Sequence, residues 1–93
     1  MYKNIDEIIF IDNLPTLDLH GYDRETAKVY INDFIKENQK LKNSFIVIVH
    51  GIGTGVIRNI TNQVLKNNKN VIEFKMSNFN EGCTLVHIKI DFE

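Results

Sequence analysis

Apolar and polar positions along the chain follow two different periods, and each change of period marks the border of an expected element. A helical period over residues 24–41, and again from Val56 to Leu65, predicts two amphipathic helices. Alternation with a period of two predicts strands that have one covered face, whereas a continuous apolar run predicts a strand buried on both faces. These patterns place strands at residues 17–20, 71–76 and 84–90, and a central strand at residues 45–49.

The predicted order is strand, helix, strand, helix, strand, strand, with no internal repeat and no interdomain linker. Because crossovers between parallel strands are right-handed, both helices should cover the same face of one mixed four-stranded sheet. The expected fold class is therefore α/β, as an α+β two-layer sandwich. We assign this domain to residues 17–93. Residues 1–16 form an N-terminal extension, whose run Ile8–Ile11 is either an extra strand or a flap over the sheet.

The alternation also predicts which way side chains point. In the first strand, Leu17 and Leu19 should face the helices, while Asp18 and His20 face the open side of the sheet near the strand's carboxyl end. Asp23 is placed to cap the first helix. In the third strand, the residues expected to point inward are Ile72, Phe74 and Met76, and those expected to point outward are Glu73 and Lys75.

Composition narrows the class of protein. A chain of 93 residues with 43% hydrophobic and 25% charged residues is typical of one globular domain. The single cysteine, Cys83, excludes a disulfide framework and a cysteine-based zinc site, and we expect it to be a small buried residue. No apolar run is long enough to span a membrane, and the acidic start does not resemble a signal peptide. We expect a cytoplasmic protein that is monomeric.

Charge is unevenly distributed, although the net charge is only −1. Residues 24–75 carry nine Lys and Arg against four Asp and Glu, whereas both ends of the chain are acidic. This basic middle could attract an anionic ligand. It could equally be the mixed-charge surface of two solvated helices.

A glycine-rich segment, His50-Gly51-Ile52-Gly53-Thr54-Gly55, joins the central strand to the second helix. Glycines allow the backbone to approach a ligand, and the first N–H groups of a helix favour a phosphate oxygen. Arg58, one turn into the helix, could add a charged donor. The alternative is a tight connection that needs glycines only for its geometry.

The histidines divide into candidates for chemistry and candidates for packing. Histidine can act as a general acid or base near neutral pH, so His20 is a catalytic candidate that Asp18 could orient. The alternative is that Asp18 caps a turn and His20 has no task. His50 either contacts phosphate or only bonds the loop, and His87, beside Lys89, is expected to be an ordinary surface residue. Their spacing is not that of a zinc site.

Three aromatic residues could stack on bases, namely Tyr2, Tyr22 and Phe79, although aromatic residues at the ends of elements often only pack locally. Tyr22 is the best placed of them, because it directly follows His20-Gly21.

Taken together, three segments resemble the motifs of the Smr (small MutS-related) domain. LDxHG matches Leu17–Gly21, and HGxGxG followed by a basic residue matches His50–Gly55 and Arg58. A glycine-containing loop that leads into T-x-V matches Gly82–Val86. The resemblance covers residues 17–90, nearly the whole chain apart from the N-terminal extension.

The resemblance implies an endonuclease that nicks or cleaves DNA or RNA, in a family associated with control of recombination and with ribosome or mRNA quality control. It implies a fold similar to the C-terminal domain of bacterial translation initiation factor three. By position, Asp18 and His20 match the cleavage motif. The residues that match the substrate-binding loop are His50, Gly51, Gly53 and Gly55. A divalent cation, Mg²⁺ or Mn²⁺, is a possible cofactor, which Asp18 could hold.

Two positions depart from the family pattern. Ile52 stands where a Lys or Arg is usual, which removes one cation that could face a phosphate and weakens salt-dependent binding. Asn80 stands near a position where the family usually has a further glycine. Both departures affect expected substrate affinity more than chemistry.

Three functions follow from these observations. The first is an Smr-type endonuclease acting on RNA or structured DNA. The second is a non-catalytic adaptor that docks on nucleic acid or on the ribosome, which Ile52 and the near-neutral charge favour. The third is a small-molecule enzyme that binds phosphate, which a domain offering little depth for a closed pocket disfavours.

Overall fold

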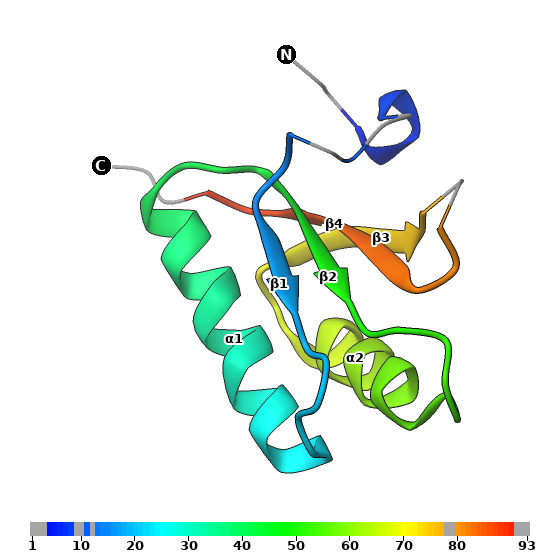
Figure 1. Cartoon of the computed structure of the whole chain (residues 1–93). Helices are drawn as coiled ribbons and strands as arrows, with labels where there is room; N and C mark the ends of the chain where they lie inside the picture. Colours follow the sequence, from blue (N-terminus) through cyan, green and yellow to red (C-terminus); the bar gives the residue numbers. More distant parts are fainter. Residues whose placement is uncertain (1–3, 9–10, 12, 78–79, 91–93) are drawn as a thin grey trace.

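A computed structural model describes residues 4–8, 11, 13–77 and 80–90 (Figure 1). Its elements are η1 (Ile5–Glu7, a 3₁₀ turn), β1 (Thr16–Asp18), α1 (Arg24–Lys40), β2 (Phe45–Val49), α2 (Val56–Asn67), β3 (Val71–Met76) and β4 (Cys83–Ile88). The predicted order of helices and strands is confirmed. The first and last strands are shorter than predicted, since β1 ends at Asp18 and β4 ends at Ile88.

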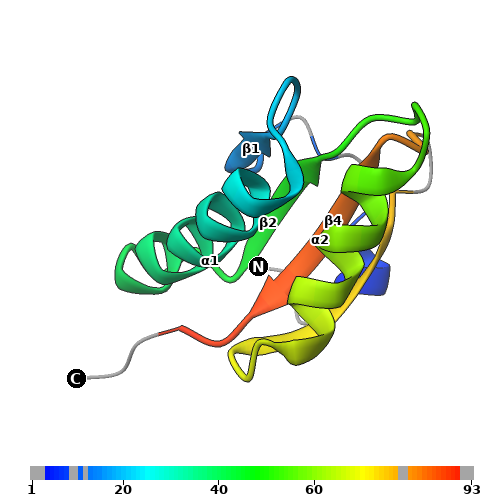
Figure 2. The same cartoon turned by 90° about the horizontal axis from the view of Figure 1, so that it is seen from below.

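The four strands form one mixed sheet in the order β1-β2-β4-β3. β1 and β2 are parallel neighbours, and β4 runs antiparallel to both β2 and β3. Both helices lie on the same face of this sheet, as predicted (Figures 1 and 2). Since each helix follows one of the two parallel strands, α1 and α2 begin at the edge where β1 and β2 end.

The main core lies between the sheet and the two helices. Leu19, which directly follows β1, and Ile46 and Ile48 of β2 pack against Ile31 and Ile35 of α1. Their side chains are almost completely buried. Leu17 packs against the same core, so both leucines of the first strand face the helices, as the alternation predicts.

The opposite face of the sheet is covered in part, which agrees with the flap alternative for the N-terminal extension. Ile5 and Ile8 are buried there against Phe45, Val47 and Leu85. The N-terminal extension is therefore a cover over this face, and its described part contains the 3₁₀ turn η1. Residues 9, 10 and 12 lie outside the described residues, so the strand alternative for that run stays a prediction.

Strand β3 departs from the predicted alternation because its register with β4 shifts between Val71 and Glu73. The shift leaves Ile72 without a paired residue on β4, and the side chains of Ile72 and Met76 are exposed. Phe74 packs against the main core, as predicted. The inward direction predicted for Ile72 is wrong, because the bulge puts this residue out of phase with Phe74. Met76 stays in phase with Phe74, but its side chain is exposed at the end of β3.

The two helices begin in different ways. At α1 the Asp23 carboxylate accepts a hydrogen bond of 2.8 Å from the Thr26 N–H, which confirms the predicted cap and lowers the pKa of Asp23. At α2 the preceding residue is Gly55, which has a left-handed backbone and no side chain to cap the helix. In the described part of the chain no helix is long and apolar enough to cross a membrane.

Candidate functional site

The two segments that contain the candidate site residues, 18–21 and 50–55, lie at the same edge of the sheet. Asp18, the last residue of β1, lies opposite Val49, the last residue of β2, and Val49 lies opposite Cys83 on β4. The turn at residues 18–21 and the glycine loop at residues 50–55 therefore leave neighbouring strands at the same edge. This is the edge at which open α/β sheets place their ligands.

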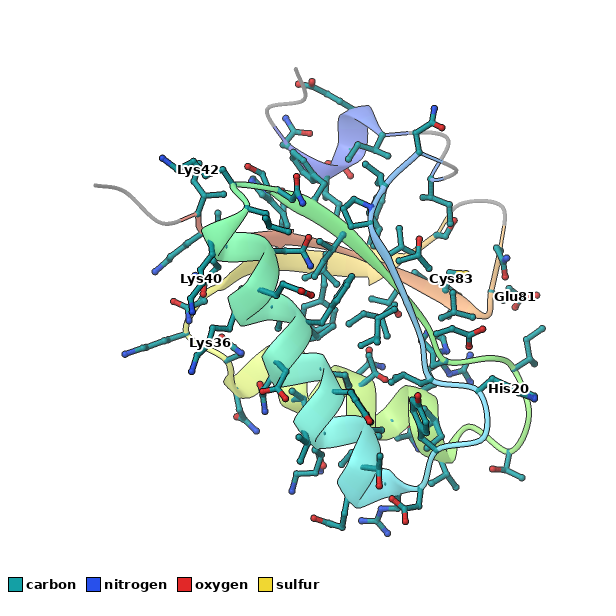
Figure 3. All side chains as sticks on the ribbon, turned by 60° about the vertical axis from the view of Figure 1, so that its left-hand side comes forward. His20, Lys36, Lys40, Lys42, Glu81 and Cys83 are labelled. Atoms are coloured by element: carbon teal, nitrogen blue, oxygen red, sulfur yellow. The ribbon has the colours of Figure 1, made fainter. Side chains whose placement is uncertain are left out.

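The turn that follows β1 holds an exposed imidazole. The Asp18 Oδ1 atom accepts a hydrogen bond of 2.9 Å from the His20 N–H, and both residues are exposed. Leu19 between them is buried in the main core, and its N–H donates to the Val49 carbonyl. His20 thus lies in a turn after the strand, not on the strand as predicted, and its side chain projects from the surface at this edge (Figure 3).

His50 is in the opposite situation, because its ring is buried and both ring nitrogens are bonded. Nδ1 lies 2.9 Å from the Gly51 carbonyl oxygen, and Nε2 lies 2.8 Å from Thr84 Oγ1. A carbonyl can only accept, so Nδ1 carries the proton and Nε2 accepts from the Thr84 hydroxyl. Burial lowers the pKa of His50, with a smaller contribution from the Arg58 charge, which favours this neutral ring.

The hairpin between β3 and β4 is fixed against the start of the glycine loop. The Gly82 carbonyl oxygen accepts from the His50 N–H at 2.9 Å and from the Gly51 N–H at 3.0 Å. A side chain at Gly82 would bring its Cβ within 3.3 Å of the Gly51 Cα, so the two backbones need this glycine for their close approach. The Gly51 N–H is therefore already bonded within the protein.

Further along the loop, backbone donors face solvent. In this stretch, which the structure describes completely, no hydrogen bond uses the N–H groups of Ile52, Gly53 or Gly55. Arg58 lies close by: a Cβ at Gly55 would lie 3.9 Å from its Nη2 atom. Exposed amides, an uncapped helix start and a guanidinium together favour an anionic group.

Cys83 is buried beneath this edge, as predicted. Burial raises the pKa of its thiol, and the negative charge of Asp18 adds to the effect. A buried thiol with a raised pKa is a poor nucleophile. The carboxylate of Asp18 is thus near enough to influence Cys83, although it points to solvent.

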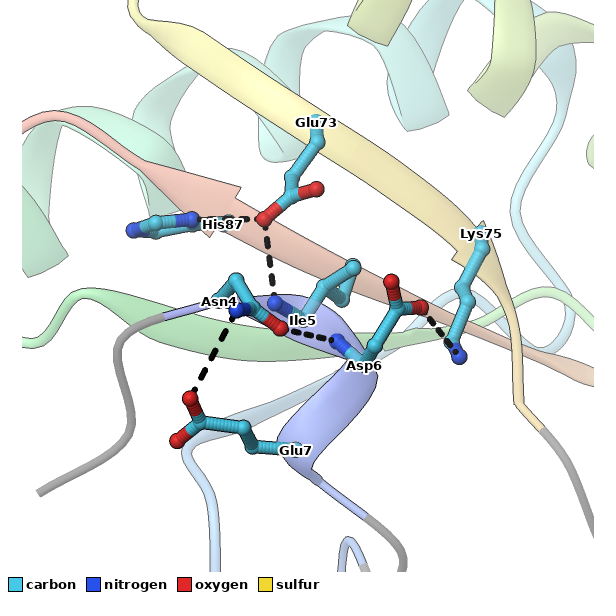
Figure 4. A network of polar contacts seen from close by, with 7 residues as sticks. All are labelled: Asn4, Ile5, Asp6, Glu7, Glu73, Lys75 and His87. Carbon is cyan, nitrogen blue, oxygen red and sulfur yellow. Dashed lines mark hydrogen bonds and ion pairs between the residues drawn. The ribbon is translucent and has the colours of Figure 1, made fainter.

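His87 is not the ordinary surface residue that the sequence predicts. Its Nδ1 lies 3.0 Å from Glu73 Oε2, and its ring stacks on Phe45 with centroids 4.3 Å apart. The same Glu73 oxygen accepts from the Ile5 N–H at 3.0 Å, so the pair fixes η1 to the sheet (Figure 4). These two bonds, first that to His87, lower the pKa of Glu73.

The sequence predicts only part of the contact between Glu73 and His87. Glu73 and His87 occupy outward positions on two strands that the sequence identifies, but their pairing depends on the bulge at Ile72. A second contact, 3.1 Å between Lys75 Nζ and Asp6 Oδ1, also joins β3 to η1. His87 therefore belongs to the attachment of the N-terminal cover, away from the edge with His20.

Of the three aromatic residues proposed to stack on bases, only Tyr22 is described, because Tyr2 and Phe79 lie outside the described residues. Tyr22 is 39% exposed, and its ring stacks on Tyr30 with centroids 4.9 Å apart. The Tyr22 N–H donates to the Leu19 carbonyl at 3.1 Å, which fixes the ring directly after the His20 turn.

Comparison with known proteins places the chain in a family. The Smr domain model matches residues 17–89. A segment of the protein named Endonuclease MutS2 from Clostridium acetobutylicum is 36% identical over 73 residues, which are 78% of this chain and 9% of that protein. The corresponding protein from Streptococcus suis is 42% identical over 78 residues, again 78% of this chain and 10% of that protein. The chain thus spans about a tenth of the length of the curated relatives it matches.

Two solved structures share the fold. The Smr domain of Thermus thermophilus MutS2 superposes with a TM-score of 0.79 at 25% identity, over 82% of this chain and 99% of that domain. YdaL, a stand-alone small MutS-related protein from Escherichia coli, superposes with a TM-score of 0.74 at 17% identity, over 80% of this chain and 63% of YdaL. The motifs, the fold and the family match agree: the chain belongs to the Smr domain family.

Proposed function

We propose that this Smr domain is an endonuclease that nicks or cleaves phosphodiester bonds in RNA or structured DNA. The observation that carries the proposal is the position of the exposed Asp18–His20 turn at the same sheet edge as the glycine loop and Arg58. The His20 side chain in this turn can move a proton, and the glycine loop with Arg58 can hold a phosphate. The names of the MutS2 relatives support the same activity.

His20 acts as the general acid or base in this proposal. In RNA, a base that removes the proton of a 2′-hydroxyl lets that oxygen attack the adjacent phosphorus, and an acid returns a proton to the departing 5′-oxygen. In DNA, a water molecule takes the place of the 2′-hydroxyl. Asp18 orients His20 through the backbone bond, and the amides of Gly53 and Gly55, with Arg58, stabilise the charge on the phosphate.

His50 and Gly51 take an indirect part in substrate binding. Both N–H groups are bonded to Gly82, and the His50 ring is bonded to Thr84, so these residues hold the loop in shape. A direct contact between His50 and a phosphate would require the ring to break one of its two hydrogen bonds. We therefore assign phosphate contact to the later part of the loop.

The donor set at the edge does not suit a divalent cation held by the protein alone. Among the described residues there is no group of three His, Cys, Asp or Glu side chains that could bind a metal ion. Mg²⁺ and Mn²⁺ are bound through several oxygen ligands, and Asp18 offers one carboxylate. In this proposal the side chains and amides of the chain itself carry the proton transfer and hold the phosphate.

A non-catalytic adaptor for nucleic acid or the ribosome is the second candidate. It is favoured by Ile52, which is 63% exposed at the tip of the glycine loop and presents an apolar surface where a cation would serve a nuclease. An adaptor would bind without turnover. Its affinity would respond to Lys and Arg changes in residues 24–75 but not to the loss of Asp18.

The cellular setting is part of the proposal. A cytoplasmic protein acting on recombination intermediates, or on mRNA at the ribosome, fits a family member with these motifs. We propose that it acts as a monomer, because Asp18, His20 and the glycine loop lie at one sheet edge of the same domain.

The test is a cleavage time course on labelled single-stranded RNA, duplex DNA and branched DNA, in Mg²⁺, Mn²⁺ or EDTA. The parent is compared with the variant Asp18→Asn/His20→Ala, whose changes are both exposed. Cleavage by the parent that the variant lacks supports the nuclease, and the metal arms show whether a cation takes part. Binding without cleavage by either protein supports the adaptor.

A further inference from the structure

A groove runs between the two helices and opens beside the candidate site. Three hollows in the surface share lining residues and so form one continuous depression. The first and second share Arg24 and Val56, and the second and third share Ile60 and Gln63. We call this depression the helix groove. Most of its lining residues belong to α1 and α2, which lie side by side on one face of the sheet (Figure 2).

The mouth of the helix groove lies between the two candidate motifs. One wall begins with Tyr22, which comes directly after the His20 turn and is fixed to it through Leu19. The other wall begins with Val56, the residue that directly follows Gly55 of the glycine loop. A polymer whose phosphate lies on the loop can therefore continue into the groove without crossing the molecule.

Tyr22, Val56 and Ile57 make part of the mouth apolar, beside the charged residues Asp23, Arg24 and Glu25. Tyr30 stacks on one face of the Tyr22 ring, and Tyr22, which lines the mouth, is 39% exposed. Val56 is 45% exposed on the opposite wall. Aromatic rings that are held in place and exposed are platforms on which nucleobases stack without regard to sequence.

The remainder of the groove suits a polar, anionic strand. Its lining there includes Arg24 and Lys28 and no carboxylate, and Asn59 and Gln63 offer exposed amides from α2. The two carboxylates of the depression, Asp23 and Glu25, are confined to the mouth, where Glu25 Oε1 lies 4.0 Å from Lys28 Nζ. Amides can bond base edges, while the two cations can face phosphates. At the far end the Asn68 amide donates to Asn32 at 3.0 Å, which joins the two helices and closes the groove.

We propose that the helix groove binds a single-stranded polynucleotide segment next to the scissile phosphate, with one unpaired base stacked on Tyr22. The inference rests on the proposed function, since the strand in the groove is the substrate. A duplex keeps the faces of its bases inside the stack, so only an unpaired or extruded base can reach the ring. The domain therefore selects unpaired nucleotides beside the cut.

Binding measurements on the full chain test this proposal. Fluorescence anisotropy compares labelled single-stranded RNA, single-stranded DNA and the matching duplexes. We expect Tyr22→Ala to bind either single strand about 10-fold more weakly, and Tyr22→Phe, which keeps the ring, to bind as the parent does. The RNA and DNA arms identify which polynucleotide is preferred.

A pair of charge variants on one helix tests the groove itself. Gln63→Glu puts a carboxylate into the groove, whereas Asn62→Asp adds the same charge to the neighbouring exposed residue, which does not line it. We expect several-fold weaker single-strand binding for Gln63→Glu and no change for Asn62→Asp. Photocrosslinking of a 4-thiouridine strand should label the peptide that contains Tyr22.

The outcomes separate this inference from the proposed function. Single-strand binding with the expected variant pattern supports the groove even when no strand is cut. Equal binding by Gln63→Glu, Asn62→Asp, Tyr22→Ala and the parent, tighter binding of duplexes, or crosslinks confined to β4 overturns the groove even when cleavage is observed. Absence of any polynucleotide binding overturns both.

Discussion

The chain contains the dipeptide His-Gly twice, at the ends of two neighbouring parallel strands, and the two copies have opposite environments. Gly21 and Gly51 have nearly the same left-handed backbone, with φ of 83° and 76°. Among the described residues, His20 is nevertheless exposed and bonded only through its backbone, whereas His50 is buried with both ring nitrogens bonded.

The position of each strand in the sheet explains this difference. In the part of the chain that the structure describes, β1 is an edge strand with β2 as its one neighbouring strand. β2 lies between β1 and β4, and the β4 side supplies the Gly82 carbonyl and the Thr84 hydroxyl to His50. A histidine at the end of a central strand becomes part of the framework, while the same residue at the end of an edge strand stays accessible for chemistry.

The largest effect is expected on the cleavage rate when the exposed histidine, His20, is replaced. His20→Ala should lower the rate of cleavage by about 10²–10⁴-fold, because a positioned general acid or base contributes about that much. The melting temperature should stay at the parent value, since the side chain is exposed. Added imidazole should restore part of the rate. A variant that cleaves like the parent would remove His20 from the chemistry.

The next effect concerns the bond that fixes His50. Thr84→Val removes the hydroxyl that donates to Nε2 and should lower the free energy of unfolding by about 1–3 kcal/mol, the cost of an unsatisfied buried group. Urea denaturation at neutral pH measures this loss. Thr84→Ser keeps the hydroxyl and serves as the control; equal losses for both variants would mean that the bond to His50 contributes little.

A smaller effect on stability is expected at the left-handed glycine that each His-Gly dipeptide contains. Gly21→Ala and Gly51→Ala should each cost about 1–2 kcal/mol of folding free energy, because both backbones are left-handed. Neither added Cβ would have a neighbour within 4 Å, so the cost is conformational and should be similar at the two sites. Thermal denaturation of both variants checks this; a much larger loss at one site would show that its glycine has a packing role.

The smallest expected effect is the dependence of the free energy of unfolding on pH that His50 causes. The pKa of His50 is lowered in the folded protein, so the unfolded chain takes up the proton first as the pH falls below the ordinary value of 6.5. The free energy of unfolding should therefore decrease as the pH falls through that value. His50→Gln should flatten the stability curve between about pH 7.5 and pH 5.5. An unchanged slope in the variant would show that another group causes the decrease.

Glu73 acts in a separate pH range. Its lowered pKa means that its contribution to stability is present above its ordinary value of 4.5 and is lost at more acidic pH. The two ranges allow the loop and the N-terminal cover to be distinguished in one titration.

Most of the fold could be predicted from the sequence, because its signals are local. The helical period, the Asp23 cap and the apolar run of β2 each depend on neighbouring residues, and the structure confirms all three. The outward direction of Ile72 could not be predicted, since the register shift depends on pairing with β4.

The sequence predicts which residues form the candidate site, but not which of them are exposed for chemistry and which are buried in the framework. The motifs bring Asp18, His20 and the glycine loop to one edge, as expected from parallel neighbouring strands. The burial of His50 depends on Thr84, and the role of His87 depends on Glu73 and the N-terminal turn. These partners are distant in sequence, so spacing alone carries no signal for them.

The most direct test of the account is the single-turnover cleavage rate of the parent and of Asp18→Asn/His20→Ala, with protein in saturating excess over labelled single-stranded RNA or branched DNA. Saturation removes any difference in affinity, so the rate reports chemistry alone. If Asp18 and His20 carry the chemistry, the cleavage rate of the variant should be lower by at least about 10²-fold, with an unchanged melting temperature. Equal rates for the two proteins would contradict it.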